Sequence, residues 1–416
     1  MTPTLSTEVI SVNTRKKLLI ISYSKLDTDP RILRQIELLK DDFDICTAGL
    51  LPSNQPAVKI HYNIVDVEPT FHRSYKVLFR KLVTLFYILP IRFINKLISN
   101  LYLKNLKDYE KLYWSRNRKA TLSTLVTCRA DLIIANDIDT LPLAVKLKSI
   151  NGGKIYFDAH EYSPLEYENN PAWLKFKAPY YTYLCSKYVA LSNYNTTVSN
   201  GLLRKYEELT GREFDLVLNA PSYESLNPSS REDQFIKFIH HGNASPDRNT
   251  DRLVNAFLRS TRTDIELHLM IINLKSEYGG YIQSLARDAP NIFFHKPVPT
   301  SEISSFINQF DVGIYFLPPL NFNQEYALPN KFFEFIQGRL MLAFGPSVEM
   351  KKYILEHELG LVGNGFEEED IIECINSISV EDVSRYKTSV NASAPLLSAE
   401  TSMNHLKTKL AELCAE

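Results

Sequence analysis

Short apolar runs, several of which end in polar residues, recur along this chain, and they restrict its fold more than any other feature. Four of the clearest are Leu18–Tyr23, Ala130–Asp137, Phe235–His240 and Val312–Leu317. Uninterrupted apolar runs of about four to eight residues are typical of strands that are buried on both faces of a parallel sheet. Segments with helical spacing of apolar residues separate the runs. This alternation predicts an α/β fold built from parallel sheets.

Further strands are expected along both halves of the chain, at Phe43–Ala48, Lys154–Glu161, Val189–Val198, Val217–Pro221, Glu266–Ile272, Ile292–His295, Leu340–Phe344 and Leu359–Val362. A chain of 416 residues exceeds one typical core, so two domains are expected. Residues 221–231 are rich in Ser, Pro and Asn and make the best linker. We therefore predict a flexible N-terminus at 1–15, domains at 16–222 and 223–396, and a helix at 397–416 that packs back on the N-terminal domain.

Composition excludes several classes of protein. A net charge of −1 argues against nucleic acid as a partner. The five Cys are widely spaced, which predicts reduced thiols, and neither Cys nor His has metal-ligand spacing. No G-x-G-x-x-G follows the first strand, so no dinucleotide cofactor is expected. We also expect no secretion signal and no transmembrane helix.

Residues 71–119 depart from this neutral average. They hold twelve Lys and Arg against two acidic residues, with apolar and aromatic residues between them. A basic amphipathic stretch of this kind is typical of helices that lie on an anionic membrane surface. The alternative is a pair of helices that cover a domain, with apolar faces inward and Lys outward. The localised charge favours membrane contact.

Polar side chains follow two of the expected strands in the first half of the chain. Asp137 ends one run, and Asp158, His160 and Glu161 end the next. Ligands bind beyond the carboxyl ends of strands in open parallel sheets, so we expect these residues to face one crevice. His160 as a core histidine bonded to a carbonyl is the alternative. Arg31, at the start of the first helix, is either an anion ligand or a solvated or paired side chain.

The second half carries two candidate anion sites. Gly242 to Asn249 form a small polar loop in which Arg248 comes just before a helix. The segment Glu325–Phe335 enters an apolar helix at Pro329, and Lys331 adds positive charge at that helix N-terminus. Glu334, one turn further, is suited to accept hydrogen bonds from hydroxyls. The alternative is an ordinary strand–loop–helix with a solvated Lys and Glu.

Taken in order, these motifs resemble the glycosyltransferases of the GT-B fold, and among them the family-four-like (glycosyltransferase group 1) enzymes of bacterial surface-polysaccharide pathways. The resemblance covers the chain from about residue 16 to the final helix. It rests on Asp29-Pro30-Arg31-Ile32, Asn136-Asp137, Tyr156 to Glu161, Gly242 to Arg248, Pro329 to Glu334, and Gly338.

The resemblance implies two Rossmann-like domains that face a cleft, with a nucleotide sugar on the C-terminal domain and the acceptor on the N-terminal one. It implies diphosphate contacts from Arg248 and Lys331, ribose contacts from Glu334, and a sugar contact from His160. The family has a sugar-binding Glu eight positions before Glu334, and this chain has Tyr326 there, with Glu325 beside it. The implied site is catalytic His160, Glu161, Asp137 and Asp158; donor-binding Gly242, Asn243, Arg248, Val298, Tyr326, Asn330, Lys331 and Glu334; and Asp29 and Arg31 on the acceptor side.

The sequence therefore predicts a glycosyltransferase that moves a hexosyl or hexosaminyl group from a nucleoside-diphosphate sugar to a lipid-linked or glycan acceptor. It is expected to be retaining, independent of metal and of other cofactors, cytoplasmic, and peripheral at the inner face of the cytoplasmic membrane. An inverting enzyme would need a general base such as Asp137, Asp158 or Glu161. The alternatives are a non-catalytic scaffold of the same fold, which the missing Glu motivates, and a nucleotide-sugar epimerase.

Overall fold

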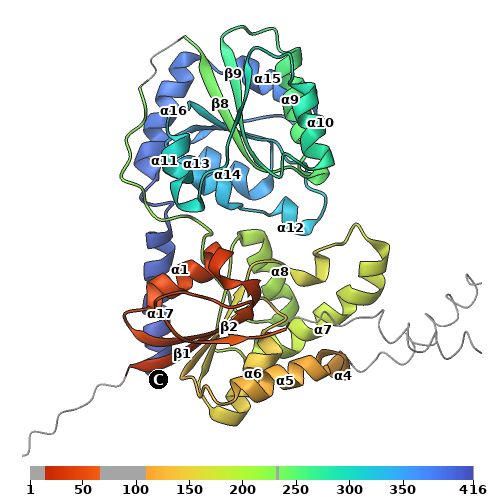
Figure 1. Cartoon of the computed structure of the whole chain (residues 1–416), viewed down its shortest axis with the longest axis vertical. Coiled ribbons are helices and arrows are strands. Elements are labelled where there is room, and N and C mark those ends of the chain that lie inside the picture. The colour runs from red at the N-terminus through yellow and green to blue at the C-terminus, as the bar shows by residue number, and fades with distance from the viewer. Residues whose placement is uncertain (1–14, 66–108, 231–233, 416) are drawn as a thin grey trace, which may run out of the picture. The chain divides into compact units, whose positions relative to one another are not determined.

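Two parallel sheets organise the chain (Figure 1). The computed structural model describes residues 15–65, 109–230 and 234–415. The first sheet has seven strands in the order β3 (Val58–Asn63), β2 (Phe43–Leu50), β1 (Lys16–Lys25), β4 (Leu132–Asn136), β5 (Lys154–Ala159), β6 (Tyr194–Thr197) and β7 (Asp215–Leu216). The second has six in the order β10 (Ile292–His295), β9 (Ile265–Ile272), β8 (Ile236–Asn243), β11 (Val312–Tyr315), β12 (Met341–Phe344) and β13 (Gly360–Val362).

Helices connect these strands, as parallel pairing requires. Those of the first half are α1 (Pro30–Leu39), α4 (Tyr109–Tyr113), α5 (Arg116–Leu125), α6 (Leu141–Asn151), α7 (Ala178–Tyr188) and α8 (Asn200–Thr210), with a π-helix at Trp173–Lys177 before α7. Those of the second half are α9 (Thr250–Arg259), α10 (Glu277–Leu285), α11 (Ile303–Ile307), α12 (Phe322–Glu325), α13 (Asn330–Gln337), α14 (Val348–Glu356), α15 (Glu368–Ser377), α16 (Val380–Ser393) and α17 (Ala399–Ala415).

The first strand–helix unit shows how the sequence specifies these elements. Leu18, Leu19, Ile20 and Ile21 of β1 are at most 1% exposed, and the parallel partners β2 and β4 flank the strand on its two edges. Helix α1 then begins at Pro30, whose missing N–H is not needed in the first turn. The Asp29 carboxylate caps the helix by accepting from the Arg31 N–H at 3.1 Å.

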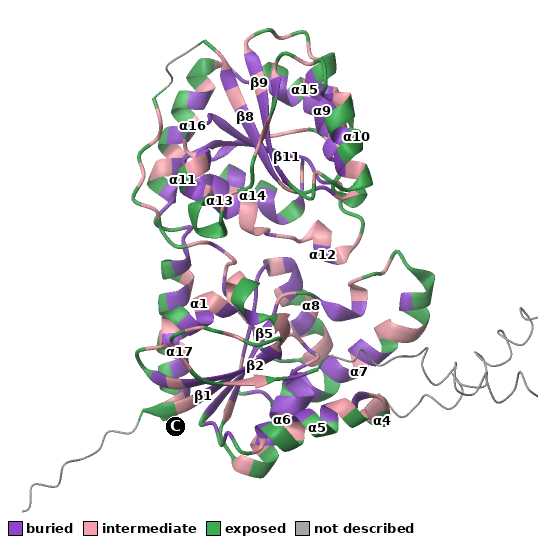
Figure 2. Cartoon of the chain, in the orientation of Figure 1, coloured by how far each residue is buried: buried purple, intermediate pink, exposed green. Residues whose placement is uncertain are grey.

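The six-stranded sheet carries apolar side chains on both faces, and each face packs into its own core cluster. Phe238, Leu267 and Ile314 belong to one cluster, and Ile239 and Tyr315 to the other. Residues next to each other in a strand point to opposite faces, which explains this division. Figure 2 shows the result, with buried strands and helices whose exposed residues face outward.

By packing, the chain divides into two compact units, and each is described by itself below. The first unit holds residues 1–158, 183–195 and 410–416, and the second holds 159–182 and 196–409. The end of α17 thus belongs with the first unit, where Lys16 Nζ donates to the Cys414 carbonyl. The predicted boundary at residue 222 lies between β7 and β8 in the sequence and stays a prediction.

Most of the predicted strands are confirmed, and two need correction. The segment Val189–Val198 was expected to be one strand, but it holds a short 3₁₀ turn at Val189–Leu191 and then β6. The strand expected at Val217–Pro221 is wrong, because only Asp215–Leu216 form β7 and the following residues are irregular. The edge strand β3 was not expected, since its residues are mostly half-buried or exposed and carry little apolar signal.

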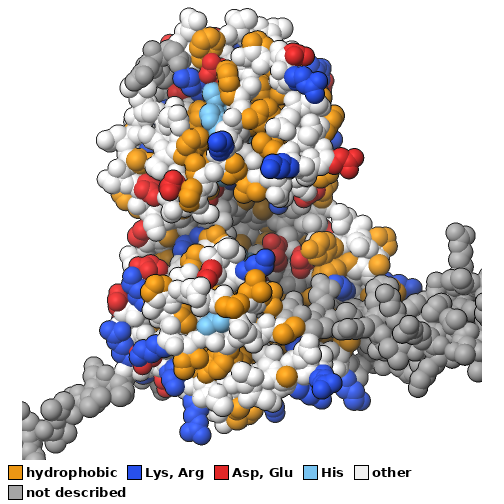
Figure 3. All heavy atoms as spheres, in the orientation of Figure 1, with side chains coloured by type: hydrophobic (Ala, Val, Ile, Leu, Met, Phe, Trp, Pro, Cys, Tyr) orange, Lys and Arg blue, Asp and Glu red, His pale blue; other side chains and the backbone are white. Residues whose placement is uncertain are grey.

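Most of the basic segment 71–119 lies outside the described residues. Within its described part Arg118 is only 2% exposed: Nη2 contacts Asp139 Oδ1 at 3.0 Å, and the guanidinium lies 4.2 Å from the Tyr113 ring centroid. This basic side chain therefore packs inside the protein and is not free for a membrane. On the face in Figure 3, Lys and Arg side chains of the described residues are interspersed with Asp and Glu. No helix in the described parts of the chain is long and apolar enough to cross a membrane.

Candidate functional site

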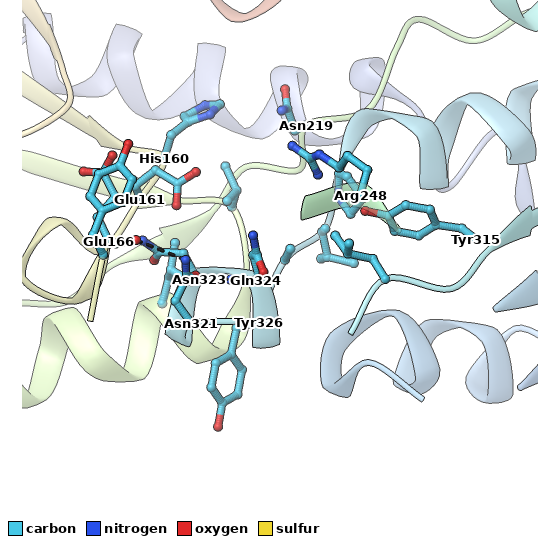
Figure 4. A pocket seen from close by; sticks show the side chains of 17 residues that line it. His160, Glu161, Glu166, Asn219, Arg248, Tyr315, Asn321, Asn323, Gln324 and Tyr326 are labelled. Atoms are coloured by element: carbon cyan, nitrogen blue, oxygen red, sulfur yellow. Dashed lines mark hydrogen bonds between the residues drawn. The ribbon is translucent and has the colours of Figure 1, made fainter. Parts of the chain in front are cut away.

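A polar cavity of about 380 Å³ lies in the second unit (Figure 4). Its wall combines residues from four parts of that unit: the loop after β5, the start of α8, the segment after β7, and the strand ends and loops of the six-stranded sheet. The lining side chains are His160, Glu161, Glu166, Tyr167, Val198, Leu202, Asn219, Arg248, Tyr315, Leu317, Asn321, Asn323, Gln324, Tyr326, Ala327, Leu328 and Pro329. This set brings together four residues that were predicted for catalysis or donor binding and lie far apart in the sequence, namely His160, Glu161, Arg248 and Tyr326.

Two cations meet at Tyr315, the last residue of β11. Lys331 Nζ lies 4.2 Å from the Tyr315 ring centroid and donates to the His241 carbonyl at 2.8 Å. Burial raises the pKa of the Tyr315 phenol to about 12, against the opposing effect of the nearby Arg248 guanidinium. Burial, and then the charge of Arg248, lowers the pKa of Lys331 to about 7. Two positive groups held together in this way are poised for an anion with more than one charge.

The backbone around these cations leaves room for a ligand. Gly242 has φ +154°, and a Cβ added there would lie 3.1 Å from Lys331 Nζ. Helix α13 begins after Pro329 without a side-chain cap; the Phe332 N–H donates to the Pro329 carbonyl at 3.0 Å, and the N–H groups of Asn330 and Lys331 come before the first helical hydrogen bond. The Asn330 Oδ1 atom is buried and has no hydrogen-bond partner in the described structure. Glycine and an uncapped helix N-terminus are the features with which backbone groups approach phosphates.

Behind Lys331 lie two neutral histidines and Glu334. His240 Nδ1 donates to the Ile314 carbonyl at 3.0 Å, and burial, followed by the charge of Lys331, lowers the pKa of His240 to about 3. The same causes, in the same order, lower the pKa of His241 well below its usual value. Glu334 is 5% exposed, with Oε2 at 3.4 Å from His241 Nε2. Glu334 is thus placed beside Lys331, as the Pro-Asn-Lys-Phe-Phe-Glu spacing predicts.

His160 and Glu161 follow β5 and line the cavity away from Arg248 and Tyr315 (Figure 4). The hydroxyl of Tyr206, on α8, donates to the Glu161 carbonyl at 2.7 Å and fixes this turn. The backbone is held while both side chains line the cavity. His160 is therefore a cavity residue rather than a histidine of the sheet core.

Tyr326 holds the position at which the resemblance implied a sugar-binding Glu. Its ring packs on α8, since a Cβ added to Gly201 would lie 1.9 Å from Tyr326 Cδ1. In Figure 4 this side chain extends away from the other labelled residues. The neighbouring Glu325 is not among the residues that line the cavity.

Sequence reasoning missed the side chains of α12 and of the loop before it. Asn321, Asn323 and Gln324 line the cavity, and Glu166 faces them from the other chain segment. Their only sequence signal is a cluster of amide side chains between a strand and a helix. Such a cluster is also typical of an ordinary loop.

The remaining predicted residues of the first unit form a separate polar network. Arg31 Nη2 contacts Asp137 Oδ2 at 2.9 Å and Asp29 Oδ2 at 3.7 Å. Gln35 Nε2 donates to Asp158 Oδ2 at 2.8 Å, and Asp158 is 4% exposed. Asp137 adopts φ 61°, a conformation that is uncommon outside glycine. The structure thus places Asp137 and Asp158 in ion-pair and hydrogen-bond contacts, and their catalytic role stays a prediction.

Two predicted donor residues, Asn243 and Val298, lie near strand ends of the second sheet. Asn243 ends β8 and accepts from Asn273 Nδ2 at 2.7 Å, while Val298 packs against an apolar cluster. Neither is among the residues that line the cavity. Among the described residues no group of three or more His, Cys, Asp or Glu side chains is arranged to hold a metal.

Comparison with known proteins identifies the fold. The chain matches no protein-family model and no curated protein sequence. It is similar to the structure of HepE from Anabaena in complex with UDP and glucose, with a TM-score of 0.64 and 12% identity over 95% of this chain and 100% of that one. Sucrose-phosphate synthase from Thermosynechococcus elongatus gives a TM-score of 0.66 and 10% identity over 96% and 100% of the chains.

The apo form of the lipopolysaccharide outer core galactosyltransferase WaaB gives a TM-score of 0.59 and 10% identity over 94% of this chain and 99% of that one. At such low identity the likeness shows the fold alone. That fold is GT-B, which confirms the prediction of two Rossmann-like parallel-sheet domains.

Proposed function

We propose that this chain is a glycosyltransferase that takes a sugar from a nucleoside-diphosphate sugar. The observation that supports it most strongly is the pair of cations at Tyr315, Arg248 and Lys331, beside a cavity that continues to His160 and Glu161. One end of this arrangement suits a diphosphate, and the other end suits a sugar and its acceptor.

In this proposal the two cations accelerate the reaction by stabilising the leaving diphosphate. Breaking the bond between sugar and diphosphate leaves negative charge on the leaving group and positive charge on the sugar carbon. Arg248 and Lys331 stabilise the leaving diphosphate without a metal, and preorganised charge of this kind is usually the largest catalytic contribution. Glu334 accepts hydrogen bonds from the ribose hydroxyls, and His160 contacts the sugar. The transfer retains the configuration of a hexosyl or hexosaminyl group.

The donor and acceptor are proposed from the similar structures. HepE was crystallised with UDP and glucose, so uridine nucleotides are the first donors to test. WaaB is a galactosyltransferase of the lipopolysaccharide outer core, which favours a lipid-linked or glycan acceptor in bacterial surface-polysaccharide synthesis. Residues 71–119 then hold the protein at the inner face of the membrane through basic side chains other than the buried Arg118. Asp29 and Arg31 lie on the acceptor side.

A two-part experiment tests the proposal. The full-length protein is first melted with UDP, GDP, ADP and the corresponding nucleotide sugars, and a bound nucleotide raises the melting temperature. It is then incubated with the binding nucleotide sugars and a mixture of lipid-linked and free glycans, and the products are separated. Absence of both stabilisation and turnover would contradict the proposal, whereas an isomerised nucleotide sugar formed without acceptor would identify an epimerase.

A further inference from the structure

The cavity has two chemically different ends, and one side chain lies between them. Figure 4 shows Arg248 and Tyr315 on one side, His160 and Glu161 on the other, and Gln324 between them. A sugar bonded to a diphosphate at Arg248 must occupy the next part of the same cavity. That part is the one that Gln324 lines.

The helix that carries Gln324 is fixed by contacts to a distant segment of the same unit. Asn323 Oδ1 accepts from the Tyr162 N–H at 2.8 Å, and Asn321 Nδ2 donates to the Glu166 carbonyl at 3.1 Å. The Phe322 ring lies 5.6 Å from the Tyr162 ring in a T-shaped contact. Because these contacts hold the N-terminal part of α12, directly before Gln324, the position of Gln324 is set by the fold.

The side-chain amide of Gln324 is also oriented. Its Oε1 accepts from the Leu320 N–H at 2.8 Å. A side-chain NH₂ group cannot accept this hydrogen bond, so the Oε1 atom faces Leu320 and Nε2 is the other end. The Nε2 group makes no hydrogen bond to any other described residue. Gln324 therefore offers two N–H donors at the middle of the cavity.

The charges that line the cavity restrict what those donors can bind. Glu161 and Glu166 line the same space as Gln324. A sugar that carries a carboxylate would meet both of these side chains, and like charges in a partly enclosed site disfavour such a ligand. A neutral sugar with an oxygen that accepts a hydrogen bond fits the donor without this cost.

We propose that Gln324 is the residue that selects the donor sugar, by donating a hydrogen bond from Nε2 to an oxygen of a neutral hexose or acetamidohexose. This inference rests on the proposed function, because it assumes a diphosphate at Arg248. Tyr326 also lines the cavity, but its ring packs on Gly201, and Glu325 does not line the cavity. Gln324 is therefore proposed to take the place of the carboxylate that the resemblance implied.

The test compares a nucleoside diphosphate with its sugar conjugates. Calorimetry measures the dissociation constants of UDP, UDP-glucose, UDP-N-acetylglucosamine and UDP-glucuronate for the wild type, Gln324→Ala and Gln324→Glu. The Glu variant keeps an acceptor for Leu320 and loses the donor, so it separates sugar binding from loop stability. Gln309→Ala and Gln309→Glu, at an exposed glutamine of the same unit, are the matched controls.

In the wild type a neutral conjugate should bind about tenfold more tightly than UDP, and UDP-glucuronate should show no such gain. Both Gln324 variants should lose the gain and leave the affinity for UDP within twofold. If both variants bound the neutral conjugates within twofold of the wild type, this inference would be overturned. Binding of UDP in the same experiment would still support the proposed function. Failure of every uridine, guanosine and adenosine diphosphate to bind the wild type would instead overturn the proposed function and this inference with it.

Discussion

The carboxyl ends of the two sheets carry polar groups of opposite character. At the first sheet, Arg31 is paired with Asp137 and Asp29, and Gln35 bonds Asp158. At the second sheet, the Lys331 ammonium contacts a neutral carbonyl and an aromatic ring, and Arg248 reaches Asp247 only at 3.8 Å. The first network satisfies its own charges, whereas the second leaves positive charge that a ligand can neutralise. Charged side chains that are paired with one another thus indicate a structural network. Cations with few acidic partners in the protein indicate a candidate binding site.

The largest expected difference between the carboxyl ends of the two sheets is in stability, when Arg31 of the first sheet's network is removed. Arg31→Ala should lower the free energy of unfolding by about 3 kcal/mol, because it leaves the buried Asp158 and the partly buried Asp137 and Asp29 without their shared counter-ion. Urea denaturation followed by circular dichroism measures this loss. Nucleotide affinity of the folded variant should remain within twofold of the wild type. Lys59→Ala, which breaks the exposed pair with Asp44, is the control and should change stability by less than about 1 kcal/mol.

At the carboxyl end of the second sheet, removal of a cation should weaken ligand binding and leave stability nearly unchanged. Arg248→Ala should weaken nucleoside-diphosphate binding about 100-fold, equivalent to about 2.7 kcal/mol, and change the free energy of unfolding by less than about 0.5 kcal/mol. The side chain is 44% exposed, so little packing is lost. Calorimetry with the nucleotide measures the affinity. Binding within twofold of the wild type would place the diphosphate elsewhere, and a large loss of stability would make this end structural as well.

A third prediction asks whether Tyr326 belongs to the packing or to the binding site. Gly201→Ala should destabilise the protein by about 2 kcal/mol, because the new Cβ would lie 1.9 Å from Tyr326 Cδ1. The double variant Gly201→Ala/Tyr326→Ala should be more stable than the sum of the single changes predicts. Gly280→Ala, in α10 with open space around its Cα, should instead stabilise by about 0.5 to 1 kcal/mol. Additive effects in the double variant would contradict the packing role.

The smallest effect is a dependence on pH. Lys331 has a pKa of about 7 in the free protein, lowered by burial and then by Arg248, and a bound diphosphate raises it. Affinity for a nucleotide sugar should therefore fall as pH rises, by about tenfold between pH 6.5 and 8.5. Its diphosphate does not titrate in this range, so the slope reports the protein. Lys331→Met should bind weakly with no such slope, whereas Arg248→Ala should bind weakly and keep a slope that is shifted to higher pH, because one cause of the lowered Lys331 pKa is removed.

The same shift has a consequence for stability. The unfolded Lys331 side chain binds its proton up to about pH 10.4, whereas the folded one releases it near pH 7. The unfolded chain therefore holds more protons between these values, and this residue makes stability rise with pH across that window. Lys331→Met should remove that part of the rise in urea denaturation measured at pH 7 and pH 9. An unchanged pH dependence would mean that Lys331 is charged in the free protein.

The sequence could predict the sheets because their central strands are buried on both faces. Leu18–Tyr23 and Val312–Leu317 are apolar runs that can be recognised in the sequence, and the structure has a strand at each of them. Strand β3 could not be found in this way, because an edge strand with exposed residues has no such run. Arg248 and Lys331 were also predictable, since a cation beside a glycine loop or a helix start is a local pattern.

The sugar half of the candidate site was not predictable from local patterns. The position of Gln324 depends on hydrogen bonds from Asn321 and Asn323 to a segment 155 to 161 residues away. How the Tyr326 side chain is oriented in the cavity wall depends on the space above Gly201, on another helix. Spacing placed Tyr326 in the site, and it does line the cavity, but only tertiary packing shows that its ring lies against Gly201.

Helix α8 also depends on a distant group. Its own cap residue, Ser199, makes no capping hydrogen bond, and Glu349 of α14 accepts from the Gly201 N–H at 2.8 Å and from Asn200 Nδ2 at 3.1 Å. Glu349 comes 148 residues after Gly201. At a synthesis rate of about 5 to 20 residues per second, the ribosome needs roughly 7 to 30 s to add it. During that interval the nascent α8 has an open N-terminus, which makes it the first place to look for chaperone contact or proteolysis while the chain is being made.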